Sequence, residues 1–235
     1  MRILISFYSW FIGITFFTFI LWTTLFCSFL FRPETYDPWM KKLLRILFKI
    51  LFVKVEVEGS EKIEQNKAYL LMCNHVSFFD IPLFGGYIPT FFRSIEAEWQ
   101  HKLPLYGWVL RRYGNITIKR ENIHSSIRSI REAENFIRGG KSLLILPEAH
   151  RTPDGNLQPF KKLPFFLAKR VEVDLVPIGT TGLYHLMRKG TWHIRPTTIK
   201  IKFGTIIPAE KVKSLSAMEL RDLTWKEIQG LIENP

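Results

Sequence analysis

A histidine and an aspartate stand five residues apart in the stretch 73–80, Cys-Asn-His-Val-Ser-Phe-Phe-Asp. On a helix, five residues turn through roughly 500°, and on a strand an odd spacing puts two side chains on opposite faces. His75 and Asp80 can therefore meet only if the chain turns between them. A carboxylate bonded to one imidazole nitrogen fixes the tautomer and leaves the other nitrogen free as a base. The alternative is a loop histidine beside an ordinary capping box.

The flanking residues supply such a turn. Residues 68–73 form a short apolar run of strand length, and residues 77–80 are typical of a helix start. We therefore expect His75 in a strand-to-helix loop, with Asp80 in the first helical turn behind it.

From residue 53 onward, short strand patterns alternate with helix patterns. This alternation predicts an α/β fold, with a central, largely parallel sheet flanked by helices. The predicted strands are residues 53–58, 68–73, 91–95, 116–119, 142–146, 173–177 and 197–203. The predicted helices are residues 79–85, 97–112, 123–138, 162–169 and 217–233.

The composition favours an acidic partner surface. The chain has 235 residues and a formal net charge of +12, so nucleic acid, anionic lipid and phosphorylated substrates all qualify as partners. Its two cysteines, Cys27 and Cys73, lie in apolar stretches. We expect neither a disulfide nor a metal site from them.

The N-terminal segment 3–31 is uncharged and rich in aromatic residues. It is long enough to span a bilayer, and it is too long for a cleaved signal peptide. Its scattered serines and threonines leave a tilted or half-inserted helix open. The cation excess after this segment predicts that the rest of the chain lies on the cytoplasmic face of the membrane.

A second helix is predicted to open at Asp37 and Pro38 and to continue through residues 39–53. Four cations lie on one narrow face of this helix, and nearly all its remaining residues are apolar. This pattern is typical of an amphipathic helix lying in a membrane interface. A core helix is the alternative. We accordingly divide the chain into a membrane-associated two-helix region, 1–53, and an α/β domain, 54–235. The cations on one narrow face of the helix are Lys41, Lys42, Arg45 and Lys49.

Two basic clusters are expected where open α/β sheets bind ligands, at or after strand ends. The alternating stretch 113–120 delivers Lys119 and Arg120 to the end of a strand, and residues 160–162 add Lys161. The alternatives are a solvated strand end and ordinary basic surface.

A third cluster, residues 146–152, directly follows an apolar strand. Arg151 can bind phosphate bidentately, and Glu148 can accept a bond from a sugar or glycerol hydroxyl. A polar loop with a Glu–Arg ion pair is the alternative.

Taken in order, these blocks resemble the glycerolipid acyltransferase family, especially the 1-acyl-sn-glycerol-3-phosphate acyltransferases, over roughly residues 55–205. The family's four blocks are N-H-x-x-x-x-D, G-x-x-x-I-x-R, F-P-E-G-T-R-S and V-P-I. The first block is matched by Asn74, His75 and Asp80, and the second by Gly114, Ile118 and Arg120. The third is matched in part, by Pro147, Glu148 and Arg151, and the fourth by Val176, Pro177 and Ile178.

The chain departs from the family pattern at several positions, and in the third block Thr152 replaces Ser. Ala149 and His150 stand where the family usually has Gly and Thr, Leu163 replaces a common Gly, and Glu96 lies where a lysine is frequent. A glycine lost at position 149 restricts the backbone near the acceptor phosphate. These changes leave the acceptor's identity open.

The resemblance implies transfer of an acyl group from a thioester to the sn-2 hydroxyl of 1-acyl-sn-glycerol-3-phosphate, which forms phosphatidic acid. His75 is the implied base and Asp80 orients it. The implied substrate-binding residues are Gly114, Lys119, Arg120, Glu148, Arg151 and Lys161. No metal or bound cofactor is implied, and the donor is acyl carrier protein or acyl coenzyme A.

Two other functions stay open. One is acyl transfer to a lyso-aminolipid or to glycerol 3-phosphate. The other is a basic, membrane-tethered binding module for nucleic acid or acidic lipid without catalysis. The four ordered blocks favour an enzyme, so we expect a membrane lipid acceptor and an anionic membrane surface as partners, and no nucleic acid.

Overall fold

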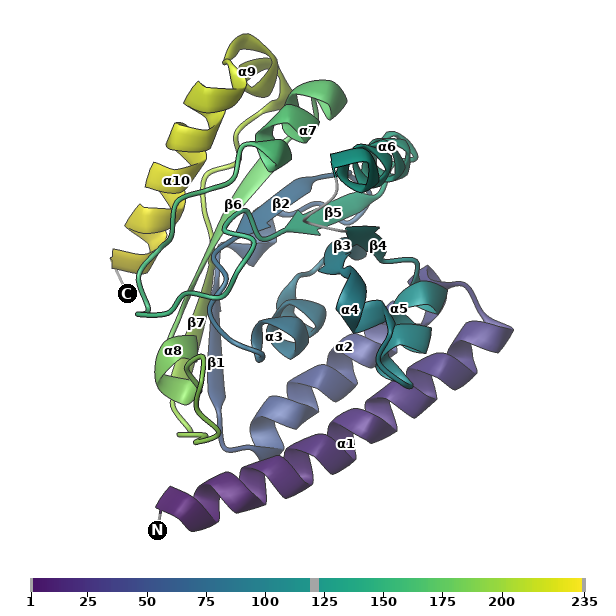
Figure 1. Ribbon diagram of the computed structural model, residues 1–235, viewed down its shortest axis with the longest axis vertical. Helices are drawn as coiled ribbons and strands as arrows, with labels where there is room; N and C mark the ends of the chain where they lie inside the picture. Colours follow the sequence, from purple (N-terminus) through teal and green to yellow (C-terminus); the bar gives the residue numbers. More distant parts are fainter. Residues whose placement is uncertain (1, 119–122, 234–235) are drawn as a thin grey trace.

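In the computed structural model, which describes residues 2–118 and 123–233, the strands form one mixed sheet (Figure 1). The strand order is β1-β7-β6-β2-β5-β3-β4, and all neighbours pair in parallel except β6 and β7. The largely parallel sheet predicted from the sequence is confirmed. The strands are β1 Lys54–Glu58, β2 Leu70–Cys73, β3 Phe92–Ala97, β4 Ile116–Ile118, β5 Ser142–Ile145, β6 Leu175–Thr181 and β7 Thr198–Phe203.

Helices cover both faces of this sheet. In Figure 1, α6, α7, α9 and α10 lie on one side of it, and α1, α2 and α3 lie on the other. The helices are α1 Arg2–Leu30, α2 Pro33–Ile50, α3 Asp80–Tyr87, α4 Glu98–His101, α5 Tyr106–Tyr113, α6 Ile123–Arg138, α7 Leu163–Val171, α8 Leu183–Leu186, α9 Ala209–Ser214 and α10 Ala217–Glu233, with a 3₁₀ turn η1 at Ser60–Lys62.

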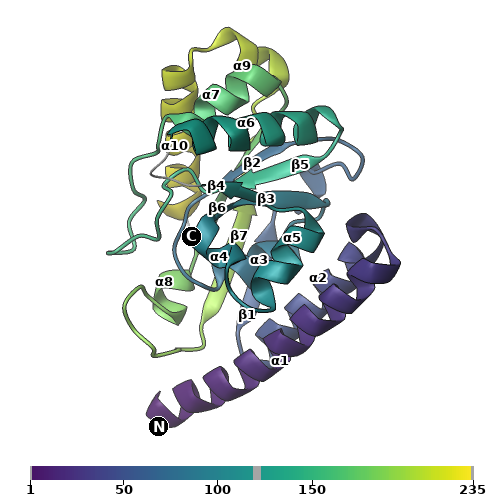
Figure 2. The same ribbon diagram turned by 45° about the vertical axis from the view of Figure 1, so that its right-hand side comes forward.

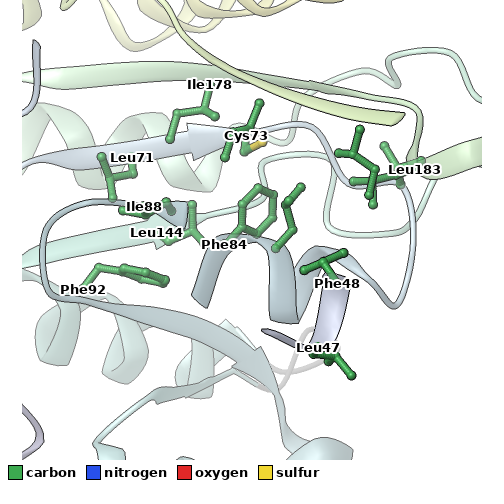
Figure 3. Packing of buried hydrophobic residues seen from close by; sticks show 14 of the residues in the cluster. Leu47, Phe48, Leu71, Cys73, Phe84, Ile88, Phe92, Leu144, Ile178 and Leu183 are labelled. Carbon is green, nitrogen blue, oxygen red and sulfur yellow. The ribbon is translucent and has the colours of Figure 1, made fainter. Parts of the chain in front are cut away.

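The central strand β2 connects the two hydrophobic clusters of the core. Its side chains alternate, because successive residues of a strand point to opposite faces. Leu71 and Cys73 pack with residues of α2 and α3, as Figure 3 shows, whereas Leu70 and Met72 pack with residues of α6, α7 and α10. A strand buried on both faces explains why residues 68–73 read as a continuous apolar run.

The predicted start of the second helix is wrong, and one face of this helix packs in the core. α2 begins at Pro33, so Asp37 lies inside the helix and forms an ion pair with Lys41, one turn later. Lys41 is buried and also donates to the carbonyl oxygen of Thr90 at 3.2 Å. Leu47 and Phe48 pack in the same cluster as β2 (Figure 3). One face of α2 therefore belongs to the core, whereas Trp39 and Ile46 are exposed on the other.

α1 lies alongside α2 and α5, and it leaves one long face uncovered (Figure 2). It is the one described helix that is long and apolar enough to cross a membrane. Its buried Ile20 belongs to the same cluster as Phe48 and Leu71, so the core continues across residue 53. The exposed large side chains of α1 are Ile3, Leu4, Ile5, Phe7, Tyr8, Phe11, Ile14, Phe19, Trp22, Phe26, Phe29 and Leu30.

The single helix predicted over residues 97–112 is instead two short helices, α4 and α5. Pro104 disfavours helical backbone in the residue before it, and Leu105 takes the positive φ of 58°. A Cβ at Gly107 would lie 2.2 Å from the carbonyl oxygen of His101, so only glycine fits this close turn. Helices α8 and α9 were not predicted, because four and six residues are too short for a periodic pattern.

Candidate active site

The predicted turn brings His75 and Asp80 together at the end of β2. His75 Nδ1 lies 2.6 Å from Asp80 Oδ2, and the Asp80 side chain is only 1% exposed. The carboxylate also accepts the backbone N–H groups of Val76, at 2.8 Å, and Ser77, at 3.1 Å. These two bonds hold the carboxylate in place, so Nδ1 of His75 is the protonated nitrogen and Nε2 is left as the base.

Asn74 fixes the strand end from which this turn departs. Its side-chain NH₂ donates to the carbonyl oxygen of Thr180, and its side-chain oxygen accepts the N–H of Thr180 at 2.8 Å. Asn74 is buried, so these bonds satisfy polar groups that would otherwise be costly. The amide ties the end of β2 to β6, directly before His75.

Glu148 ties the loop after β5 to the histidine turn. Its Oε1 accepts the backbone N–H of His75 at 2.5 Å, and its Oε2 accepts that of Gln158 at 2.8 Å. The residue is only 4% exposed. In addition, the N–H of Thr152 donates to the carbonyl oxygen of His75 at 2.8 Å. Glu148 therefore positions the histidine turn, and its binding of a glycerol hydroxyl stays a prediction.

Burial raises the pKa of Glu148 to about 7, against the two backbone N–H bonds, which lower it. Because the folded pKa exceeds the unfolded value near 4.5, this group's stability contribution is complete below pH 4.5. It is lost as pH rises to about 7. At 1.36 kcal/mol per pKa unit, the loss is on the order of 3 kcal/mol.

We expect Glu148→Gln to abolish this pH dependence. The measurement is the free energy of unfolding of both proteins in neutral detergent at pH 4.5 and pH 7.5. Other titrating groups are common to the two proteins, so the difference between them isolates Glu148. That difference should change by about 3 kcal/mol between the two pH values. If the difference in unfolding free energy between the two proteins were the same at both pH values, the raised pKa of Glu148 would be contradicted.

His75 opens into a cavity of about 770 Å³. Its lining is mainly apolar, with residues of α1, α2 and α5 among others, and it also includes cationic side chains. The wall residues from those helices include Phe17, Ile20, Leu21, Met40, Leu44, Val109 and Leu110. Such a space suits an acyl chain next to a charged headgroup.

Two of the predicted phosphate-binding cations line this cavity. Arg151 is half-buried, with its guanidinium carbon 3.7 Å from the ring centroid of Phe78. Lys161 is exposed, and its backbone N–H donates to the carbonyl oxygen of Pro147. The structure thus brings His75, Asp80, Arg151 and Lys161 to one cavity. Lys119 and Arg120 lie outside the described residues.

Gly114 shapes the turn after α5, and its contact with substrate stays a prediction. It follows α5 with a φ of 86°, where glycine is favoured. A Cβ there would lie 2.5 Å from the guanidinium carbon of Arg93. Gly114 is also absent from the cavity lining. The turn between α5 and β4 requires glycine at this position, which accounts for the glycine in the motif.

The departures from the family pattern also lie at this cavity. Ala149 takes a φ of 65°, so the loop keeps a left-handed residue there despite the added Cβ, at a cost of about 1–2 kcal/mol. Glu96, which accepts a 2.7 Å bond from the Ser94 hydroxyl, and His150 and Leu163 line the cavity too.

Lys189 is a cavity residue that the sequence reasoning missed. It lies in the segment after α8, which no recognised motif covers. Ser77, inside the recognised motif, was also missed as a contact: its hydroxyl donates to the carbonyl oxygen of Met187 at 2.7 Å. The sequence feature that could have indicated Lys189 is the absence of acidic residues from position 175 to position 209, which leaves the cations of this stretch without nearby partners in sequence.

Among the side chains that the structure describes, which exclude those of residues 119–128, no group of His, Cys, Asp and Glu able to hold a metal ion is found. That the protein works without a bound cofactor stays a prediction.

Fold and site together define an α/β protein with a histidine–aspartate pair at the carboxyl end of a central parallel strand, in a mainly apolar cavity that also has cationic side chains in its lining. The chain belongs to the acyltransferase family, whose model matches residues 54–199.

Proteins with similar sequences are named 1-acyl-sn-glycerol-3-phosphate acyltransferases. The chain is 33% identical over 167 residues to the 1-acyl-sn-glycerol-3-phosphate acyltransferase of Cocos nucifera, covering 71% of this chain and 54% of that protein. It is 26% identical to a probable 1-acyl-sn-glycerol-3-phosphate acyltransferase of Mycoplasma pneumoniae, covering 83% and 79%. The chain spans about half the length of the first curated relatives it matches.

A solved structure resembles nearly the whole chain. It is the 1-acyl-sn-glycerophosphate (LPA) acyltransferase PlsC from Thermotoga maritima, with a TM-score of 0.84 and 28% identity. The match covers 99% of this chain and 95% of that one, so it includes the region of α1 and α2.

Proposed function

We propose that this protein transfers an acyl group from a thioester to the sn-2 hydroxyl of 1-acyl-sn-glycerol-3-phosphate, forming phosphatidic acid for phospholipid synthesis. The observation that carries the proposal is the His75–Asp80 pair at 2.6 Å, which lines a mainly apolar cavity together with the cations Arg151 and Lys161. The names of the similar proteins support the same acceptor.

The reaction needs no acyl-enzyme. Nε2 of His75 takes the proton of the acceptor hydroxyl as its oxygen attacks the thioester carbonyl carbon. The tetrahedral intermediate then collapses, the carbon–sulfur bond breaks, and the thiolate takes the proton back from the imidazolium. Asp80 stabilises that imidazolium through Nδ1. A positioned base contributes about 10²–10⁴-fold to such a step.

The two parts of the acceptor bind to different groups: its phosphate to cations and its acyl chain to the apolar part of the cavity. Arg151 and Lys161 hold the phosphate, with Lys119 and Arg120 proposed to assist. Arg151 is suited to this role because a guanidinium binds phosphate oxygens in pairs. An acyl chain fills the apolar part of the cavity, where its burial contributes about 0.8 kcal/mol per methylene.

The acceptor is best tested directly. The detergent-purified protein is incubated with 1-acyl-sn-glycerol-3-phosphate and acyl thioesters of several chain lengths, carried on coenzyme A or on acyl carrier protein. Mass spectrometry should show phosphatidic acid, and a thiol reagent should detect one thiol per product. Glycerol 3-phosphate and a lyso-aminolipid serve as competing acceptors. Product from either of these alone would contradict the proposed acceptor.

We expect Arg151→Ala to act on the phosphorylated acceptor. Losing a charge-assisted bond should cost roughly 1.5–3 kcal/mol, which is about a 10- to 150-fold loss of kcat/KM for 1-acyl-sn-glycerol-3-phosphate. Lys226→Ala on α10 removes an exposed cation that does not line the cavity, and is the matched control. Unchanged KM and kcat in Arg151→Ala would show that this residue does not bind the acceptor.

We further propose that α1 lies in one leaflet on the cytoplasmic face of the membrane. Its contacts with α2 and α5 hold it against the domain, and its free face is apolar (Figures 1 and 2). A helix packed in this way suits a half-inserted position better than a perpendicular span. The acceptor resides in the bilayer, so the cavity meets it there.

A further inference from the structure

The reaction brings a second anionic substrate to His75. Acyl coenzyme A and acyl carrier protein both present the acyl group on a phosphopantetheine arm that ends in a phosphate. We propose that residues 187–196, which we name the 187–196 loop, bind this phosphate through Lys189, with Arg188 beside it. The inference rests on the proposed acyl transfer and identifies where the donor binds.

The charge of this region is unbalanced. No aspartate or glutamate occurs from residue 175 to residue 209, whereas five cations do: Arg188, Lys189, Arg195, Lys200 and Lys202. Lys202 is paired with Glu58. Among the described residues, no carboxylate forms an ion pair with Arg188, Lys189 or Arg195, and all three are exposed. An anionic ligand can therefore bind these cations without displacing a partner.

Lys189 reaches the cavity from a different side of β2 than the acceptor-binding cations. It lines the same cavity as His75. β2 lies between β6 and β5 in the sheet. The 187–196 loop follows β6 and α8, whereas Arg151 and Lys161 follow β5. Two anionic headgroups can thus bind to separate cations while their reacting atoms meet at His75.

The base of the 187–196 loop is held against the histidine turn. The Ser77 hydroxyl donates to the carbonyl oxygen of Met187 at 2.7 Å, and the N–H of Arg195 donates to that of Leu186 at 2.8 Å, which closes the loop. Gly190, with a φ of 82°, reverses the chain directly after Lys189. The cations therefore stand on a fixed turn, which reduces the entropy lost on binding.

The outer half of the loop is held by α1. The N–H of Ile194 donates to the Ser6 hydroxyl at 3.1 Å, and the indole N–H of Trp10 donates to the carbonyl oxygen of Trp192 at 2.6 Å. The rings of Phe7 and Trp192 lie 5.4 Å apart. If α1 lies in the membrane, the loop stands at its edge, where a donor arriving from water can reach it.

The test compares donors that differ in the phosphate. Lys189→Ala is assayed in neutral detergent micelles with acyl coenzyme A, with acyl carrier protein, and with the acyl thioester of N-acetylcysteamine, which has no phosphate. We expect the KM for both phosphopantetheine donors to rise about tenfold or more, and the KM for the N-acetylcysteamine thioester to stay unchanged. Arg188→Ala should show a smaller rise with the same pattern.

Two controls keep the result specific. Lys189→Arg retains the charge and should keep the KM within a few fold of the wild type. Lys226→Ala, on α10, should change no KM. The acceptor KM, measured at saturating donor, should not change in Lys189→Ala.

Several results would overturn the assignment. An equal loss with the N-acetylcysteamine thioester would show a general effect on the site, and a raised acceptor KM would place the acceptor phosphate at Lys189. A loss seen only with acyl carrier protein would mean a protein contact. A loss seen only on anionic vesicles would mean lipid binding. If the wild-type protein transferred nothing from any donor, the proposed function itself would fail, which is a distinct outcome.

Discussion

His75→Ala should lower kcat by at least about 10²-fold with every donor and acceptor, because it removes the base that takes the hydroxyl proton. The fold should survive. The bonds from position 75 to Glu148 and Thr152 use the backbone N–H and carbonyl, which alanine keeps. Circular dichroism and vesicle sedimentation check that the variant is folded and bound. The measurement is initial rate at saturating substrates.

A matched control tests whether the loss of activity is specific to the histidine at position 75. His185→Ala, on α8, removes an exposed histidine that does not line the cavity, and it should leave kcat unchanged. If His75→Ala kept more than about a tenth of the wild-type activity, His75 would not be the base.

Asp80→Asn should also be severe, for a reason visible in the geometry. The Asp80 carboxylate accepts bonds from His75 Nδ1 and from the N–H groups of Val76 and Ser77. The asparagine NH₂ can donate to Nδ1 instead, which puts the imidazole proton on Nε2 and removes the base. Because this effect is on the tautomer, binding of the acceptor should be kept while kcat falls.

The second large effect is expected from the exposed face of α1. Phe11, Trp22 and Phe26 are 72%, 56% and 65% exposed, so they contribute little to packing inside the protein. If this face lies in lipid, burying the three rings contributes roughly 5 kcal/mol to membrane binding. Replacing all three with glutamine should weaken partitioning into neutral vesicles by about 10³-fold.

The control for this variant is Phe166→Gln, which removes a ring that is 51% exposed on α7, across the sheet from α1 (Figure 1). It should bind vesicles as the wild-type protein does. The triple variant should still acylate a short-chain, water-soluble acceptor, because none of the three residues lines the cavity. Unchanged vesicle binding by the triple variant would place the membrane contact elsewhere.

The α2 cations, in contrast, are expected to differ among themselves. Lys42 and Lys49 are exposed, and each contributes at most about 1 kcal/mol of attraction to an anionic surface. Lys41 is buried against Asp37, so its loss leaves a buried carboxylate unpaired and destabilises the fold. A uniform role for these cations at the membrane is therefore not what the structure shows.

The sequence alone determined much of this protein. The strands were predictable because burial of a parallel sheet imposes short apolar runs such as Leu70–Cys73. The meeting of His75 and Asp80 was also predictable, because a spacing of five residues leaves only a turn to join them. Both are local properties, which depend on backbone geometry within a few residues.

Tertiary structure decided what each surface contacts. An amphipathic pattern shows that α2 has an apolar face, but lipid and a protein core select the same residues, so only packing against β2 and α3 decides between them. Likewise, the role of Glu148 in positioning the histidine turn is visible only because the backbone of His75 lies against it. Lys189 and His75 line one cavity because β6 and β2 are neighbours in the sheet, although the two strands lie about a hundred residues apart in the chain. Contacts of this kind depend on distant segments, which no local pattern encodes.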